Sequence, residues 1–139
     1  MSEIKGAEGI SEFLGNAGTF FLATEDGDQP KTRPVSFQML ENGKIYFGVG
    51  KHKDVFHQIE KNPKVEICAY KGKDIVRYYG TAVVDDDPAL FDRAVKVLPL
   101  LAQIYNEQSG LKLALFYLKD AKAEYSDMVD YTKKTPIEL

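Results

Sequence analysis

Apolar residues near the start of the chain first recur at helical spacing and then change to the pattern typical of β-strands. One short helix is predicted by four of them, Ile10, Phe13, Leu14 and Ala17. The apolar run 19–24 predicts a first strand, and the turn-forming residues 25–30 connect it to a second strand over 31–40. Because proline cannot donate a hydrogen bond to a sheet, Pro34 indicates that this second strand lies at an edge or carries a bulge.

The middle of the chain predicts further strands around one helix. The dipeptide Asn42-Gly43 tolerates the positive φ angles of a type I′ turn and is therefore a strong hairpin signal. A helix over about 53–61 should end before Pro63, because the residue that precedes a proline disfavours the helical conformation. Alternating apolar positions predict three strands in this region, at 44–49, 65–69 and 75–84.

The C-terminal part combines a long helical pattern with a last group of apolar residues. Asp87 and Pro88 are typical of an N-cap and a first helical residue, and Pro99 should kink the helix that follows. Residues 113–118 predict another strand, and residues 123–128 predict a short final strand before a polar tail. The total is about six strands in hairpin order with inserted helices, which predicts a mainly β (α+β) fold built as an antiparallel barrel.

Composition and charge narrow the class of protein. With 44% hydrophobic and 28% charged residues, the chain of 139 residues is expected to form one globular domain over 1–139, without a membrane span. A formal net charge of −3 provides no general basic field for nucleic acid. The lone Cys68 cannot form an internal disulfide, and the acidic start of the chain does not look like a signal peptide. We therefore expect a cytoplasmic protein without a metal site.

The segment 46–53 (YFGVGKHK) is the first candidate for chemistry. It ends a predicted strand with two glycines and places Lys51, His52 and Lys53 immediately before a predicted helix. Glycines let a backbone approach a ligand, the first helical turn offers free N–H groups, and lysines add positive charge, so the combination favours an anion such as a phosphate monoester. The alternative interpretation is a solvated loop with ordinary surface lysines.

Arg33 is the second candidate. It stands among alternating strand residues and could aim its planar guanidinium at a phosphate. The alternative is a charge at the end of a strand that faces water. Asp85 to Asp87 could suggest a cation site but are better explained by helix capping. His52 and His57 are five residues apart and would lie on different faces of a helix, so a shared metal ion is not expected.

Three segments, in their order and spacing, carry a family resemblance. They are residues 19–37, 44–70 and 76–84, with 121–128 as weaker support. On these residues the chain resembles the short, single-domain members of the pyridoxamine 5′-phosphate oxidase-like FMN-binding split barrels. The resemblance implies an antiparallel six-stranded split β-barrel with inserted helices and a homodimer that holds its flavins at the interface.

The resemblance also implies roles for individual residues. Arg33 would contact the phosphate or ribityl chain of FMN, His52 and Lys53 would hold the phosphate, and Lys51 would add to them. Pro34, Val35 and Ser36 would line the edge of the isoalloxazine ring. Phe47 and Gly48 would flank the flavin, and Gln38 lies where the true oxidases carry a lysine. Tyr125, with Ser126 and Asp127, would reach the flavin of the partner chain.

The implied function is that of an FMN-dependent oxidoreductase acting on an unknown small molecule. The donor would be a nicotinamide nucleotide and the acceptor a small planar or nitro compound. Pyridoxamine phosphate oxidase activity itself is not expected, because the oxidases grip substrate with an Arg-x-His pair near the C-terminus and here no histidine follows His57. The alternatives are a non-catalytic flavin carrier or sensor, a split barrel that binds a deazaflavin, or haem through His52 or His57, and an interaction module without a cofactor.

Overall fold

Eight strands form one antiparallel sheet in the computed structural model, which describes residues 3–130 and 132–139. The strands are β1 (Phe20–Asp26), β2 (Gln29–Val35), β3 (Gln38–Glu41), β4 (Lys44–Gly50), β5 (Lys64–Lys71), β6 (Asp74–Val84), β7 (Leu113–Asp127) and β8 (Lys134–Pro136). The helices are α1 (Gly6–Ala17), α2 (Asp54–Lys61), α3 (Pro88–Val97) and α4 (Leu100–Ile104). The sheet order is β2-β1-β5-β6-β7-β4-β3, and β8 pairs with β7. The mainly β (α+β) class is confirmed, with eight strands where about six were expected.

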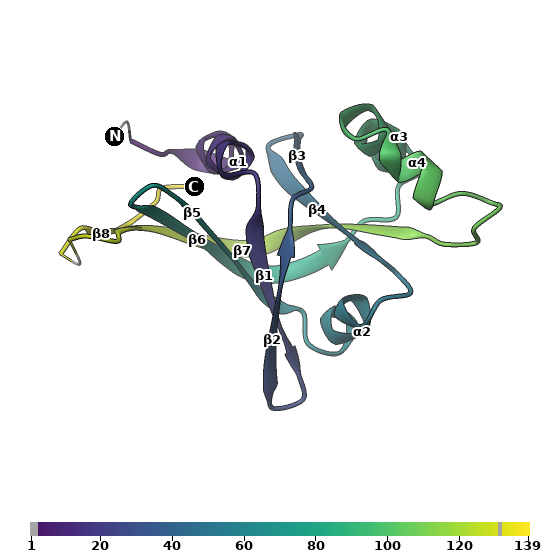
Figure 1. Cartoon of the computed structure of the whole chain (residues 1–139), viewed down its shortest axis with the longest axis horizontal. Helices are drawn as coiled ribbons and strands as arrows, with labels where there is room; N and C mark the ends of the chain where they lie inside the picture. Colours follow the sequence, from purple (N-terminus) through teal and green to yellow (C-terminus); the bar gives the residue numbers. More distant parts are fainter. Residues whose placement is uncertain (1–2, 131) are drawn as a thin grey trace.

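The long strand β7 runs across the molecule from the β8 end to the α3–α4 end (Figure 1). Two separate strands were expected here, at 113–118 and 123–128, and the structure corrects this to one continuous strand. The polar residues between the two expected strands are accommodated by a β-bulge opposite Gly80, where the register shifts and Asp120 takes a positive φ of 53°. The expected polar tail also contains β8, which pairs with Glu124, Tyr125 and Ser126 on β7.

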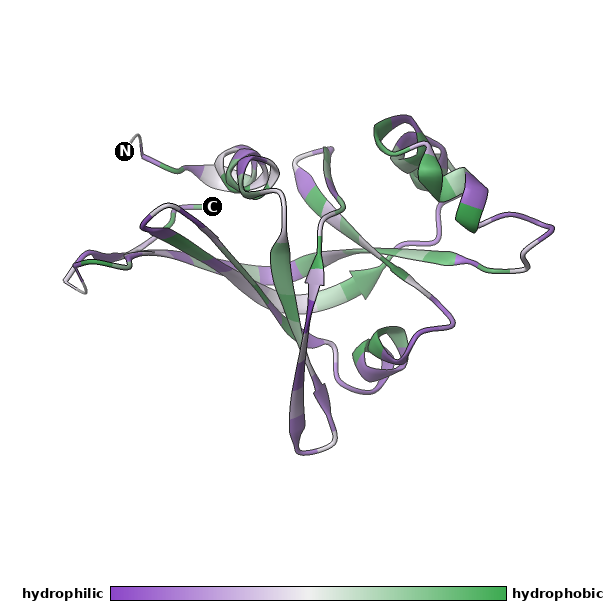
Figure 2. Ribbon diagram, in the orientation of Figure 1, coloured by the Kyte–Doolittle hydropathy of each residue, from purple (hydrophilic) through white to green (hydrophobic). Residues whose placement is uncertain are grey.

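The expected strand over 31–40 is divided into β2 and β3 because its apolar residues serve two different cores. Val35 packs against the main core, whereas Phe37 and Met39 pack into a second cluster. β2 pairs with β1 alone among the described strands, so the edge position expected from Pro34 is confirmed. The β1–β2 hairpin projects from the sheet beside α2, and its far end is hydrophilic (Figures 1 and 2).

The main core lies inside the curled sheet, with α1 and α2 packed against it. Phe47 makes aromatic contacts with Phe20 and Phe116, at ring centroid distances of 5.8 and 5.7 Å. The second cluster lies under α3 and includes Met39, Tyr46, Leu90, Ala94, Leu101 and Leu115. Two cores on two sides of the sheet leave the β2 edge and the start of α2 exposed, and this is where the candidate site lies.

Local signals of the sequence are borne out at the ends of the helices and at the hairpin. Asn42 and Gly43 have φ angles of 52° and 74°, as a type I′ turn requires. The carboxylate of Asp87 accepts a hydrogen bond from the Ala89 amide at 3.0 Å and caps α3. The helical pattern beyond it is interrupted at Pro99, so α3 and α4 are separate helices rather than one kinked helix.

We predict that Gly80→Ala lowers the free energy of unfolding by about 1–3 kcal/mol, because overpacking against rigid backbone is costly. A Cβ at Gly80 would lie 2.8 Å from the Lys119 carbonyl oxygen and 3.1 Å from the Ala121 Cα. Gly15→Ala is the matched control, since its Cβ would meet only the Gln38 side chain, at 3.7 Å. Urea unfolding of both variants checks this, and equal stabilities would show that the bulge has no need of glycine.

Candidate functional site

Arg33 on the edge strand β2 is the centre of a small polar network. Its Nη1 donates to the Leu22 carbonyl at 3.1 Å and to the Thr24 hydroxyl at 2.8 Å. Its Nη2 donates to Oε1 of Gln58 on α2 at 3.0 Å, and the Thr24 hydroxyl donates to the same Oε1 at 2.6 Å. The network thus joins strands β1 and β2 to helix α2.

The network holds a positive charge without a negative one. Thr24 is 3% exposed and Gln58 is 9% exposed, yet both are neutral. In the part of the chain that the structure describes, no carboxylate lies within 4.0 Å of the Arg33 guanidinium. Burial lowers the pKa of this guanidinium from its ordinary value. Arginine nevertheless stays protonated in proteins, so the site retains a positive charge that an anion can neutralise.

The beginning of α2 adds to this positive character. Lys53 is the N-cap residue and is exposed, and no side chain of the described residues caps the helix. The amides of Asp54 and Val55 have no backbone acceptor among the described residues. Gln58, which Arg33 contacts, follows Lys53 by five residues, a rise of about 7.5 Å along the helix. Arg33 therefore contacts the middle of α2, while Lys53 stands at the N-terminal, positive end of the same helix.

Lys51 and His52 do not join Lys53 as the sequence suggested. Nζ of Lys51 forms an ion pair with Oδ1 of Asp86 at 2.9 Å, which directs it toward the start of α3. The His52 ring lies over Gly50: a Cβ at this glycine would be 2.6 Å from Cε1 of His52 and 3.0 Å from the Tyr105 hydroxyl. The three basic residues thus diverge, because each has a different neighbour.

Phe47 and Gly48 both lie against other side chains of this chain. The Phe47 side chain is 2% exposed and belongs to the main core, which leaves its backbone as the part that could flank a flavin. The space beside Gly48 is filled by this chain itself, since a Cβ there would lie 3.2 Å from Leu113 and 3.4 Å from Phe37. Glycine at positions 48 and 50 therefore makes room for protein side chains.

Gln38 and Tyr125 lie away from the Arg33 network. The Gln38 amide accepts a hydrogen bond from the Ser11 hydroxyl at 2.6 Å and donates to the Ser11 carbonyl at 3.2 Å, so it anchors α1. The Tyr125 hydroxyl donates to Oδ1 of Asp74 at 2.7 Å, and this bond is the main reason that the pKa of Tyr125 is raised to about 12. Three strands separate β7 from β2 in the sheet, so within one chain Tyr125 cannot act beside Arg33.

The remaining expected residues follow Arg33 at the open edge. Pro34 and Ser36 are exposed and Val35 is partly buried. Because β2 has a strand on one side only, the backbone groups on its outer side can meet a ligand.

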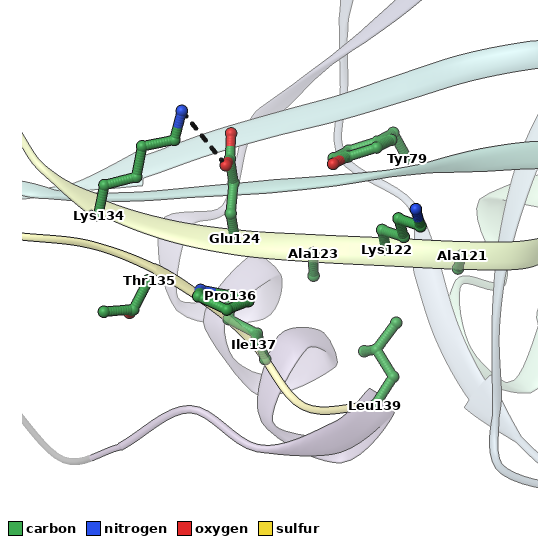
Figure 3. Close-up of a pocket in the computed structure, with 10 residues that line it drawn as sticks. All are labelled: Tyr79, Ala121, Lys122, Ala123, Glu124, Lys134, Thr135, Pro136, Ile137 and Leu139. Carbon is green, nitrogen blue, oxygen red and sulfur yellow. Dashed lines mark ion pairs between the residues drawn. The ribbon is translucent and has the colours of Figure 1, made fainter.

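Two cavities lie outside the Arg33 network. One of about 450 Å³ lies where β8 and the C-terminal residues cover β7 (Figure 3). Lys122 and Lys134 line it, Lys134 pairs with Glu124 at 3.6 Å, and no expected site residue is among its lining residues. The other, of about 560 Å³, is bordered by Lys51 and by Phe91, Tyr105 and Leu113, and it adjoins the end of β4.

Residues 3–130 and 132–139 contain no cluster of three His, Cys, Asp or Glu suited to a metal ion. They also contain no helix that is long and apolar enough to cross a membrane.

Thr24 and Gln58 are the site residues that the sequence analysis missed. Thr24 alternates with Phe20 and Leu22 on the buried face of β1, and Gln58 lies between Val55 and Ile59 on the buried face of α2. A polar residue at a position where the pattern requires an apolar one is the signal that could have identified both.

An open antiparallel sheet curled around an aromatic core, with a cationic edge strand and a short helix against it, defines the split-barrel class. A family model described as pyridoxamine 5′-phosphate oxidase matches residues 7–126, and the chain belongs to this family. No curated protein sequence matches it.

Several solved structures are similar to this one. A NimC/NimA family protein from Clostridium acetobutylicum shares 31% identity, with a TM-score of 0.79 over 91% of this chain and 88% of the other. A putative pyridoxamine 5′-phosphate oxidase from Listeria innocua shares 17% identity (TM-score 0.64; 84% and 95% covered). A pyridoxamine 5′-phosphate oxidase-related, FMN-binding protein from Nostoc punctiforme shares 15% identity (TM-score 0.65; 98% and 91% covered). At these two lower identities the likeness shows the fold.

We predict that Gln38→Ala costs about 1 kcal/mol of stability, because it removes the side-chain hydrogen bonds that hold α1 to β3. FMN affinity should not change, since the Gln38 amide is bonded to α1. Thermal unfolding and FMN titration check the two parts. Gln29→Ala, whose side chain bonds only the neighbouring Pro30 carbonyl, is the control for stability. A loss of FMN affinity in Gln38→Ala would restore the role expected from the sequence.

Proposed function

We propose that this protein binds FMN and acts as an FMN-dependent oxidoreductase. The observation that carries the proposal is the Arg33 cation, bonded to neutral groups alone, next to a helix that begins with exposed Lys53 and no side-chain cap. Membership of the family and the likeness to an FMN-binding protein support the same cofactor.

The residues at the edge fit the parts of FMN. In this proposal, Arg33, Lys53 and the first amides of α2 would donate hydrogen bonds to the phosphate dianion. The backbone of Pro34, Val35 and Ser36 on the open edge is available to the polar rim of a planar ring. When bound, FMN would supply the electron-transfer chemistry, and the role of these residues is to bind and orient it.

The cavity of about 560 Å³ next to the end of β4 is our proposed place for the acceptor. Its walls combine the apolar and aromatic side chains of Phe91, Tyr105, Leu111 and Leu113 with polar and charged ones, a mixed lining that could take a small planar or nitro compound. Leu113 pairs with Gly50, so the cavity borders the segment that leads to Lys53. We propose a nicotinamide nucleotide as the donor. Pyridoxamine phosphate oxidase activity is not proposed, since no histidine follows His57.

We further propose a homodimer with the flavins at the interface. Three strands of the sheet separate Tyr125 on β7 from Arg33 on β2. If Tyr125 contacts a flavin, that flavin belongs to the partner chain. Light scattering of the purified protein tests the dimer, and cytoplasmic location stays a prediction.

An absorbance spectrum of the concentrated protein tests the cofactor directly, repeated after FMN is added and the excess is removed by gel filtration. A retained flavin doublet in the blue supports the proposal, and a Soret band would replace FMN by haem. A colourless protein that leaves FMN fluorescence unchanged would reject it. A retained flavin that no nicotinamide nucleotide reduces would favour a carrier or sensor.

We predict that Lys53→Ala and Arg33→Ala each weaken FMN binding by about 1.5–3 kcal/mol, the usual worth of a charge-assisted hydrogen bond. Lys61→Ala, at the other end of α2, is the control, because it removes an exposed lysine from the same helix. Fluorescence titration with FMN measures all three. Wild-type affinity in both site variants would rule out this phosphate site.

A further inference from the structure

The arrangement around Arg33 is a closed ring of three side chains. The Thr24 hydroxyl accepts from Arg33 at 2.8 Å and donates to Oε1 of Gln58 at 2.6 Å, and the same Oε1 accepts from Arg33 at 3.0 Å. Because Oε1 receives two donors, the Gln58 amide cannot be turned over without placing its NH₂ group against them. The ring therefore fixes the guanidinium in one orientation.

Within this ring the charge of Arg33 is not neutralised, and not all of its N–H groups are hydrogen-bonded. Three N–H bonds of Arg33 are used, two from Nη1 and one from Nη2. A guanidinium has five, so Nε and the second hydrogen of Nη2 have no acceptor among the described residues. A carboxylate in place of the Gln58 amide could accept the same two hydrogen bonds and would neutralise the cation. The chain instead has a neutral acceptor at the position where a charged one would pair best.

We propose that Thr24 and Gln58 are positioning residues that hold Arg33 in place without neutralising it, so that its charge is satisfied by a bound phosphate. This inference rests on the proposed FMN function and names the residues that make the site select a phosphorylated flavin. It implies that FMN is preferred over riboflavin, which has the same ring and no phosphate. It also implies that a negative charge at position 58 would substitute for the phosphate.

Gln58→Glu is the central test, with FMN and riboflavin as the two probes and fluorescence titration as the measurement. The new carboxylate should lower FMN affinity by at least about tenfold, the equivalent of one charge-assisted contact. Riboflavin affinity should be unchanged, so the preference for FMN falls. The melting temperature of the flavin-free protein should rise by a few degrees, because Arg33 gains an internal ion pair. A residue that only supports the fold would not move affinity and stability in opposite directions.

His57→Glu is the matched control for charge. It adds the same carboxylate to the neighbouring, exposed position of α2, whose side chain faces Glu60 rather than Arg33. It should retain most of the preference for FMN. An equal loss in both variants would mean that any negative charge on α2 repels FMN, and this would overturn the role of Gln58.

Thr24→Val provides a second test that does not depend on how Gln58→Glu folds. Valine has the shape of threonine and removes the hydroxyl that accepts from Arg33. FMN affinity should fall by about threefold or more while riboflavin affinity is kept. A parallel loss of both affinities, or no loss at all, would overturn the inference.

Inorganic phosphate separates this inference from the proposed cofactor. Phosphate should raise the melting temperature of the wild-type protein and leave that of Gln58→Glu unchanged, because a ligand that binds only the folded state stabilises it. If the wild-type protein binds neither flavin but its melting temperature rises with phosphate and that of Gln58→Glu does not, the FMN function is rejected and the anion site is supported. A protein that binds FMN while Gln58→Glu binds it equally well would reject the inference alone.

Discussion

The pairing of the single strand β7 with three other strands holds this structure together. Its residues 113–116 pair with β4, residues 116–127 pair with β6 on the other side, and residues 124–126 also pair with β8. In the hydrogen-bonded order of the sheet β7 lies between β6 and β4, so this strand sets the relative position of the two. The bulge opposite Gly80 lets the strand bend without losing its pairing, so the sheet can curl around the aromatic core.

The candidate site depends on this curl through a few intermediates. The curled sheet buries Thr24 on β1 and places α2 against the same strand, so that Gln58 meets Thr24. These two residues then determine where the guanidinium of Arg33 lies. The core positions the neutral groups of Thr24 and Gln58, and these groups in turn hold the guanidinium of Arg33 between β1 and α2.

Short-range signals made much of the fold predictable. Asn42-Gly43 and the Asp87 cap depend on neighbouring residues alone, and both occur as expected. The continuity of β7 could not be read from the chain, because the polar stretch around Asp120 is held in the sheet by pairing with β6. The sequence pointed to Arg33 and Lys53, and the structure places both against α2. The contacts of Phe47 and Gln38 could not be predicted, since their neighbours in space are distant in sequence: Phe116 for one and Ser11 for the other.

The exposed edge at β2 also has a consequence for how the protein behaves at high concentration. A strand with one free side can recruit another chain and begin an aggregate. Here Pro30 and Pro34 each lack the N–H that a new strand would need, and Lys31 and Arg33 add charges that repel an identical edge. The edge can thus stay exposed to solvent while it resists pairing with a further strand, and both properties come from one seven-residue segment.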